Sequence, residues 1–95
     1  MSAPIETVRL RISGKVQGVG YRFWAMGTAA RLGLRGWVRN RLDGSVEALV
    51  TGNPDSVATM IEACREGPRG ARVTDVTAAP EEDDGSVGFD ARPTE

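Results

Sequence analysis

Hydrophobic residues in the first third of the chain change their spacing in the way that separates a strand from a helix. Apolar and polar residues alternate over 8–13, which predicts a half-buried strand. Apolar residues then recur at the spacing of one helix face over 21–32, and Gly33 follows where a left-handed cap would end that helix. The first third is therefore predicted to be a strand, a glycine-rich connection over 14–20 and a helix.

The middle of the chain carries the signals of a hairpin followed by a second helix. Strands are predicted over 36–40 and 45–51, because alternating apolar residues flank an Asp-Gly turn there. Asn53 and Pro54 are typical of a helix start, with an N-cap residue followed by proline at the first helical position. An apolar stripe at helical spacing continues from there until Gly67 ends the helix.

Two further segments complete the pattern. A β-rich run over 72–78 predicts a long strand, and 86–91 is compatible with a short fifth strand after an acidic loop. The order strand-helix-strand-strand-helix-strand predicts an α+β, ferredoxin-like sandwich, in which two helices cover one face of an antiparallel sheet. We expect a single domain over 1–95, with flexible ends at about 1–6 and 92–95.

Composition limits the chemistry that this fold can perform. The 95 residues include no histidine and one cysteine, Cys64, which excludes His-based catalysis, His-ligated zinc, an internal disulfide and a cysteine-cluster metal site. No apolar run approaches the roughly 20 residues of a membrane span, and the first residues lack the charged and apolar regions of a signal peptide. We therefore expect a cytoplasmic protein that needs no metal, no cofactor and no membrane.

The net charge of −1 conceals an uneven distribution of charge. Residues 1–41 carry eight basic side chains and one acidic side chain, whereas residues 81–95 carry six acidic side chains and one arginine. The basic part suggests an anionic ligand, and the acidic end is typical of a solubilising tail. Most of the arginines are expected on solvated faces, so charge alone does not identify the ligand-binding residues.

The glycine-rich connection is the strongest candidate for a ligand site. Gly14, Gly18 and Gly20 allow positive φ angles, which turn backbone amides inward, and inward amides at a helix N-terminus form an anion cradle. Arg22 follows in the first helical turn, where the helix dipole disfavours a cation but a planar guanidinium can hold the same anion. The alternative is a purely structural turn. The spacing fits neither a Walker phosphate loop nor a dinucleotide-binding fingerprint.

Asn40, at the end of a predicted strand, is the second candidate. Asparagine is depleted in strands unless a turn or a polar role requires it. The interleaved topology can bring this strand end close to the glycine-rich connection. The side chain could equally open the hairpin turn, and the residue pattern alone leaves both interpretations open.

Two segments resemble the signatures of the acylphosphatase family. Residues 12–22, Ile-Ser-Gly-Lys-Val-Gln-Gly-Val-Gly-Tyr-Arg, are similar to the first signature. Residues 36–40, Gly-Trp-Val-Arg-Asn, followed by Gly44, Val46 and Gly52, are similar to the second, with every spacing kept. These paired motifs are specific, and the resemblance extends over most of the chain.

The resemblance implies a small, metal-free cytosolic enzyme of the ferredoxin-like fold that hydrolyses acyl phosphates to a carboxylate and phosphate. By similarity, Arg22 would bind the phosphate and Asn40 would orient the attacking water. Inorganic phosphate would act as a product inhibitor. The residues that would form the amide cradle are Lys15, Val16, Gln17, Gly18, Val19, Gly20 and Tyr21.

The sequence departs from the family pattern at two places. Position 21 is tyrosine where the family usually has phenylalanine, an exchange that a buried site tolerates if the hydroxyl finds a partner. The C-terminal end, over 88–95, lacks the apolar last strand of the family, which leaves the register of a fifth strand open.

Other functions of the same fold fit less well. A ferredoxin-like RNA-binding module carries aromatic residues on its sheet, and a copper carrier carries a Cys-x-x-Cys loop, and this sequence shows neither pattern. A non-catalytic phosphate- or anion-binding regulatory module remains the alternative, because Arg22 indicates binding and only Asn40 argues for hydrolysis. We expect a monomer whose partners are an acyl phosphate and inorganic phosphate, and no nucleic acid.

Overall fold

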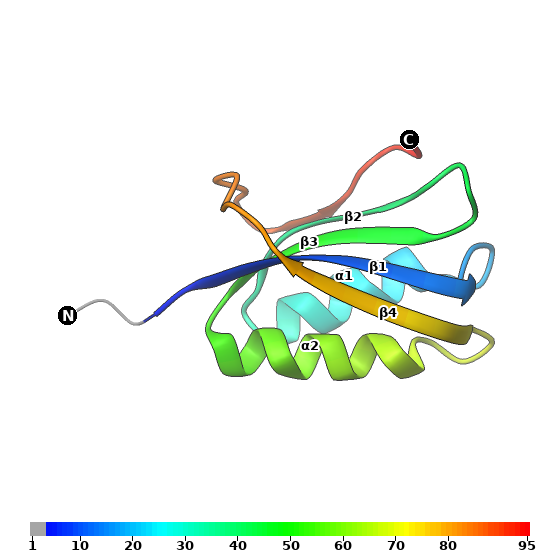
Figure 1. The fold of residues 1–95 in the computed structure, drawn as a ribbon, viewed down its shortest axis with the longest axis horizontal. Helices are drawn as coiled ribbons and strands as arrows, with labels where there is room; N and C mark the ends of the chain where they lie inside the picture. The colour runs from blue at the N-terminus through cyan, green and yellow to red at the C-terminus, as the bar shows by residue number, and fades with distance from the viewer. Residues whose placement is uncertain (1–3) are drawn as a thin grey trace.

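The computed structural model describes residues 4–95 (Figure 1). Its helices and strands follow in the predicted order and end with a short additional strand. The elements are β1 (Glu6–Lys15), α1 (Tyr21–Arg31), β2 (Arg35–Asn40), β3 (Val46–Gly52), α2 (Pro54–Glu66), β4 (Arg72–Pro80) and β5 (Phe89–Ala91).

The strands form one sheet in the order β4-β1-β3-β2-β5. β1 pairs antiparallel with β3 and β4, and β2 pairs antiparallel with β3, so the predicted ferredoxin-like fold class is confirmed. The short fifth strand also forms, but it pairs in parallel with β2 and makes the sheet mixed. The reason is that β4 and β5 lie at opposite edges, so the segment over 81–88 crosses the sheet and reverses the direction of the chain.

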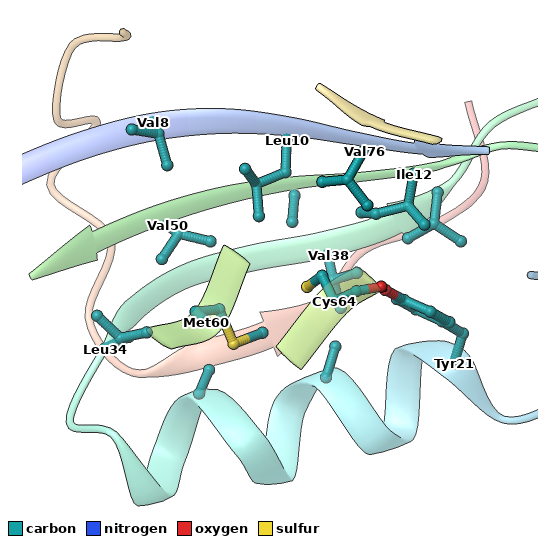
Figure 2. Close-up of a cluster of buried hydrophobic side chains, with 14 of the residues drawn as sticks. Val8, Leu10, Ile12, Tyr21, Leu34, Val38, Val50, Met60, Cys64 and Val76 are labelled. Carbon is teal, nitrogen blue, oxygen red and sulfur yellow. The ribbon is translucent and has the colours of Figure 1, made fainter. Parts of the chain in front are cut away.

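The hydrophobic core lies between one face of the sheet and the two helices (Figures 1 and 2). The alternation that predicted β1 is confirmed, because Val8, Leu10 and Ile12 all point into this core. The apolar stripes that predicted the helices are confirmed in the same way. The buried helix residues are Tyr21, Ala25, Thr28 and Ala29 on α1 and Val57, Met60 and Cys64 on α2.

The opposite face of the sheet carries several arginines beside the buried residues Trp37 and Leu49. Arg9, Arg11 and Arg39 lie there because they alternate with core residues along β1 and β2. They surround Glu47 of β3, which is only 2% exposed, and Arg41 approaches the same carboxylate. The shortest of these contacts joins Arg39 Nε to Glu47 Oε1 at 2.8 Å. A buried carboxylate is stable here because cations surround it and donate hydrogen bonds to it.

The acidic segment that follows β4 folds across this arginine face. Four of the six carboxylates over 81–95 pair with arginines that come from β1, β2 and the C-terminal end. The pairs are Glu81–Arg9 at 2.9 Å, Asp83–Arg35, Asp84–Arg92 at 3.6 Å and Glu95–Arg39 at 2.6 Å. The expectation that this segment is a solubilising tail is therefore wrong for these residues. The composition of a segment gives the number of its charges, but the fold determines which carboxylates and arginines form ion pairs.

The predicted flexible end at 1–6 includes residues 1–3, which lie outside the described residues. Glu6 already belongs to β1. At the other end, the backbone N–H of Glu95 donates to the carbonyl of Asn40 at 3.1 Å. The flexibility of both ends and the single-domain assignment stay predictions. Neither helix that the structure describes has the length and the apolar run needed to cross a bilayer.

Candidate active site

The connection between β1 and α1 forms a tight loop that ends at the N-terminus of α1. Gly14, Gly18 and Gly20 all adopt the positive φ angles that the sequence predicted. At Gly14 a Cβ atom would lie 2.1 Å from the carbonyl oxygen of Arg72, so the close approach of β4 requires glycine. Gly20 is the N-cap of α1, with φ 79° and no side chain to cap the helix. The first amides of α1 are therefore not covered by a capping side chain and can face an anion.

The side chain of Gln17 ties this loop to the turn between β2 and β3. Its Nε2 atom donates to the carbonyl of Arg41 at 2.8 Å and to the carbonyl of Ser45 at 2.9 Å. Arg41 follows the end of β2 and Ser45 precedes β3, so these hydrogen bonds hold the loop against both ends of the turn. The sequence identified Gln17 only as a source of a backbone amide and did not reveal this contact.

Arg22 is the second residue of α1 and is half-buried. Among residues 4–95 no carboxylate lies within salt-bridge distance of its guanidinium. It also lies at the end of the helix where the dipole is positive, which disfavours a cation. An arginine that the fold leaves uncompensated at this position is well placed to bind an anion.

Asn40, the last residue of β2, is half-buried and borders the same cavity as Arg22. Its side-chain oxygen Oδ1 is buried and has no hydrogen-bond partner within residues 4–95. A buried amide oxygen without a partner costs roughly 1–3 kcal/mol. The turn interpretation required this side chain to bond to the hairpin, yet Asp43 performs that role, accepting from the backbone N–H of Ser45 at 2.9 Å. The structure therefore favours a polar role for Asn40 in the cavity.

A cavity of about 380 Å³ joins the glycine-rich loop, Arg22 and Asn40. It brings together seven of the nine residues that the sequence selected, whereas exposed Lys15 and core-packed Val19 do not line it. Its lining residues are Val16, Gln17, Gly18, Gly20, Tyr21, Arg22, Phe23, Met26, Asn40 and Ala91. The functions of these residues stay predictions.

Three of the lining residues are apolar and were not selected from the sequence. Phe23 and Met26 follow Arg22 on α1, and a signal for them existed, because residues three or four apart share a helix face. Ala91 comes from β5, and no local pattern connects it to the loop. Its position depends on the parallel pairing of β5 with β2.

Tyr21 shows how the fold accommodates a hydroxyl at this position. The ring is 2% exposed and lies in the core, and its hydroxyl donates to the carbonyl of Cys64 at 2.7 Å (Figure 2). Burial raises the pKa of the Tyr21 phenol above its ordinary value, and it raises the pKa of the Cys64 thiol to about 11. Both groups therefore stay protonated at neutral pH, and neither is suited to act as a base or a nucleophile.

The chemistry available in the cavity is that of anion binding and water positioning. Residues 4–95 contain no group of three or more His, Cys, Asp or Glu side chains that could hold a metal ion. Arg22 is the one charged side chain in the described lining, and the loop supplies backbone amides. Asn40 adds an amide that can both donate and accept a hydrogen bond.

Comparisons with known proteins match this chain to the acylphosphatase family. The acylphosphatase family model matches residues 8–91. An acylphosphatase of Rhodospirillum rubrum is 51% identical over 90 residues, which are 95% of this chain and 99% of that protein. An acylphosphatase of Acidiphilium cryptum is 49% identical and covers 90% of this chain and 93% of its own.

Solved structures give the same result. The structure of an acylphosphatase from Coxiella burnetii superimposes with a TM-score of 0.89 at 34% identity, covering 93% of each chain. An acylphosphatase from Bacillus subtilis gives a TM-score of 0.89 at 32% identity, covering 94% of this chain and 99% of its own.

Proposed function

Because the chain belongs to the acylphosphatase family, we propose that Arg22 and the loop amides hold the phosphoryl group of an acyl phosphate while Asn40 orients the attacking water. As a member of this family, the chain is an enzyme that hydrolyses the carboxyl–phosphate bond of small-molecule acyl phosphates to a carboxylate and inorganic phosphate. The observation that carries the residue assignment is that Arg22, which makes no ion pair within residues 4–95, and Asn40, whose buried Oδ1 has no hydrogen-bond partner there, border one cavity.

Arg22 and the loop amides suit the binding of a phosphoryl dianion. The guanidinium can donate two parallel hydrogen bonds, and amides at the start of α1 can donate further ones along the helix dipole. Hydrogen bonds to charged groups contribute roughly 1.5–3 kcal/mol each, so a few of them hold a phosphoryl group without a metal. The same donors neutralise negative charge on the equatorial oxygens in the transition state.

Asn40 suits a neutral water molecule better than a proton transfer. An amide can accept a hydrogen bond from the water and donate one to it, but it cannot remove a proton. No carboxylate borders the cavity within the described residues. We therefore assign the proton of the attacking water to a phosphoryl oxygen of the substrate. The water oxygen forms the new bond to phosphorus, and the carboxylate leaves with the electron pair of the broken bond.

The same contacts apply to the product. Inorganic phosphate keeps the charge and the oxygens that Arg22 and the loop bind, so it should compete with the substrate. We further propose that the protein acts as a monomer. We also assign the protein to the cytoplasm and treat 1–95 as one acylphosphatase domain.

The decisive experiment compares two asparagines. In Asn40→Ala we expect kcat to fall by roughly 10²–10⁴-fold while the inhibition constant of phosphate changes little, because a positioned group acts in the transition state. Asn53 is the control, since its side chain caps α2 by accepting from the N–H of Asp55 at 2.8 Å. Asn53→Ala should cost about 1 kcal/mol of stability and leave kcat near the wild-type value.

Benzoyl phosphate hydrolysis, followed by the loss of ultraviolet absorbance, measures both variants. Excess chelator should leave the wild-type rate unchanged, and loss of activity restored by a divalent ion would contradict metal-free catalysis. A normal kcat in Asn40→Ala with a lowered unfolding midpoint would remove Asn40 from the mechanism. A wild-type protein that binds phosphate but hydrolyses no acyl phosphate would support the non-catalytic binding module instead.

A further inference from the structure

The basic side chains that form no ion pair gather at one end of the molecule. Seven of the twelve basic residues pair with a carboxylate within residues 4–95. Those that form no such pair are Lys15, Arg22, Arg31, Arg69 and Arg72. Apart from Arg31, they lie at the end of the sheet where β1 leads into α1 and α2 leads into β4 (Figure 1). The fold therefore leaves uncompensated positive charge at the end that holds the active-site cavity.

Lys15 and Arg72 lie directly opposite each other, as the last residue of β1 and the first residue of β4. Side chains in this relation project from the same face of a sheet with Cβ atoms roughly 4.5–5.5 Å apart, and like charges there are destabilising. Both side chains are exposed, and neither Glu66 nor Asp75, the carboxylates nearest to Arg72 in the sequence, forms an ion pair with them. The repulsion between the two cations decreases when an anion approaches them.

The turn between α2 and β4 brings Arg69 to the same end. The N–H of Ala71 closes this turn by donating to the carbonyl of Pro68 at 3.0 Å, and Arg69 is exposed between them. The turn packs on the first residue of α1, because a Cβ atom at Gly67 would lie 2.7 Å from Cε2 of Tyr21. Tyr21 also lines the active-site cavity, so the turn is fixed beside the site.

These three cations lie beside the cavity without lining it. Lys15 directly precedes Val16 and Gln17, which do line it. Their charges therefore act on an approaching ligand across water, over a Debye length of about 10 Å at 0.1 M salt. A site surrounded by charge of one sign raises the local concentration and the association rate of ligands of the opposite sign.

We infer that Lys15, Arg69 and Arg72 form a cationic entrance, which attracts the dianionic substrate to the cavity before Arg22 binds it. This inference rests on the proposed function, because the ligand that the entrance attracts is the phosphoryl dianion of the acyl phosphate. The entrance raises kcat/KM and leaves kcat unchanged, because it acts on the free substrate and takes no part in the chemical step.

The test measures kcat and kcat/KM for benzoyl phosphate at about 10 mM ionic strength, where the Debye length is about 30 Å. Arg72→Gln should lower kcat/KM about threefold, the scale of one charge acting on a dianion across roughly 10 Å of water. The double variant Arg69→Gln/Arg72→Gln should lose about tenfold, with kcat within about twofold of wild type in both.

Arg31→Gln is the matched control, because Arg31 also forms no ion pair within residues 4–95 but lies at the other end of α1. This variant removes the same charge and should keep the wild-type kcat/KM. A loss in Arg31→Gln as large as in Arg72→Gln would mean that only the net charge matters and would overturn the entrance. A wild-type kcat/KM in the double variant would overturn it as well.

Salt and stability separate attraction at a distance from other roles of Arg72. At about 1 M salt, where the Debye length is about 3 Å, the variants should match wild type, and a loss that persists there would contradict the entrance. Arg72→Gln should be no less stable than wild type, because it removes a contact between like charges. A fall in stability with an unchanged kcat/KM would instead give Arg72 a structural role.

The proposed function can fail separately from the entrance. If wild type does not hydrolyse benzoyl phosphate, the proposed function fails, whereas hydrolysis that is insensitive to Arg72→Gln contradicts only the entrance. Without hydrolysis, the dissociation constant of inorganic phosphate tests the entrance. It should rise about threefold in Arg72→Gln at low salt and stay unchanged in Arg31→Gln. Equal constants in the two variants would overturn the entrance.

Discussion

Arg22, in the first turn of α1, and Arg39, near the end of β2, are both half-buried, but they have opposite surroundings. Arg39 donates to Glu47 at 2.8 Å and to Glu95 at 2.6 Å, and its guanidinium lies 4.8 Å from the centre of the Trp37 ring. Arg22 makes no ion pair within the described residues. The charge of Arg39 is therefore neutralised inside the fold, whereas the charge of Arg22 remains available to a ligand.

The same difference separates the two regions in which these arginines lie, the outer face of the sheet and the N-terminus of α1. On the outer face of the sheet, arginines of β1 and β2 meet buried Glu47 and the acidic segment after β4. At the N-terminus of α1, the described residues supply neither a capping side chain for the first amides nor a carboxylate for Arg22. The first arrangement stabilises the fold, and the second lowers the free energy of a bound anion at some cost to stability.

The largest effect should follow from replacing the arginine of the site. Arg22→Lys keeps the charge but loses the planar fork, so we expect at least about a 10²-fold loss in kcat/KM. Arg31→Lys is the control, because Arg31 is an exposed residue in the last turn of the same helix. It should stay within about twofold of wild type. An Arg22→Lys enzyme within a few-fold of wild type would place Arg22 outside the site.

The next effect concerns the centre of the outer face. In Glu47→Gln the arginines lose their shared counter-charge, so the free energy of unfolding should fall by about 2–3 kcal/mol. Because the arginines are partly solvated, this fall in the free energy of unfolding is smaller than the fall expected for a fully buried ion pair. Glu62→Gln is the control, since Glu62 and Arg65 form an exposed pair on α2 at 3.3 Å. It should change stability by less than about 0.5 kcal/mol in the same denaturant titration. Equal losses would contradict the importance of Glu47.

A smaller effect tests the hydroxyl that distinguishes this chain from the usual family pattern. Tyr21→Phe removes the hydrogen bond to the carbonyl of Cys64, near the C-terminal end of α2, where backbone carbonyls lack helical partners. We expect a loss of about 1 kcal/mol in the free energy of unfolding. Thr59→Ala removes an exposed hydroxyl that bonds to the carbonyl of Asp55, and it should change stability by less than about 0.5 kcal/mol. A Tyr21→Phe protein as stable as wild type would show that this bond contributes nothing.

The smallest effect concerns pH and the acidic segment. The hydrogen bond from Arg35 lowers the pKa of Asp83 to about 2. Because this folded value lies below the ordinary value of 3.8, the contact stabilises the fold above about pH 4 and is lost as the pH falls towards 2. The amide resonance of Gly85, which donates to Asp83, reports the titration. Its midpoint should rise in Arg35→Gln, and identical midpoints in the two proteins would contradict the pairing.

Local signals predicted most of the fold. The Asp-Gly turn predicted the β2–β3 hairpin, and Asn53 with Pro54 predicted the start of α2 at the observed position. The glycine-rich connection and Arg22 were selected because each breaks an ordinary rule for its position in a strand-helix unit. These predictions succeed because their physical causes act over only a few residues.

The rest depends on contacts between distant segments. Asn40 had two interpretations until the structure assigned the hairpin bond to Asp43 and placed Asn40 beside the cavity. Ala91 lines the cavity only because the segment after β4 crosses the sheet and places β5 beside β2. Gln17 bonds to the turn between β2 and β3, which is distant from it in the sequence. The acidic segment looked like a tail because a count of charges contains no information about which arginines it meets.

The most direct test of the contrast between the two arginines is the dissociation constant of inorganic phosphate, measured by calorimetry on Arg22→Ala and Arg39→Ala with unfolding free energies in parallel. Arg22→Ala should weaken phosphate binding at least about tenfold with no loss of stability, because it removes an unpaired cation from a positive helix end. Arg39→Ala should bind phosphate within about twofold of wild type and lose about 1–2 kcal/mol of stability. Wild-type phosphate binding in Arg22→Ala, or an equal loss of binding in both variants, would contradict the account.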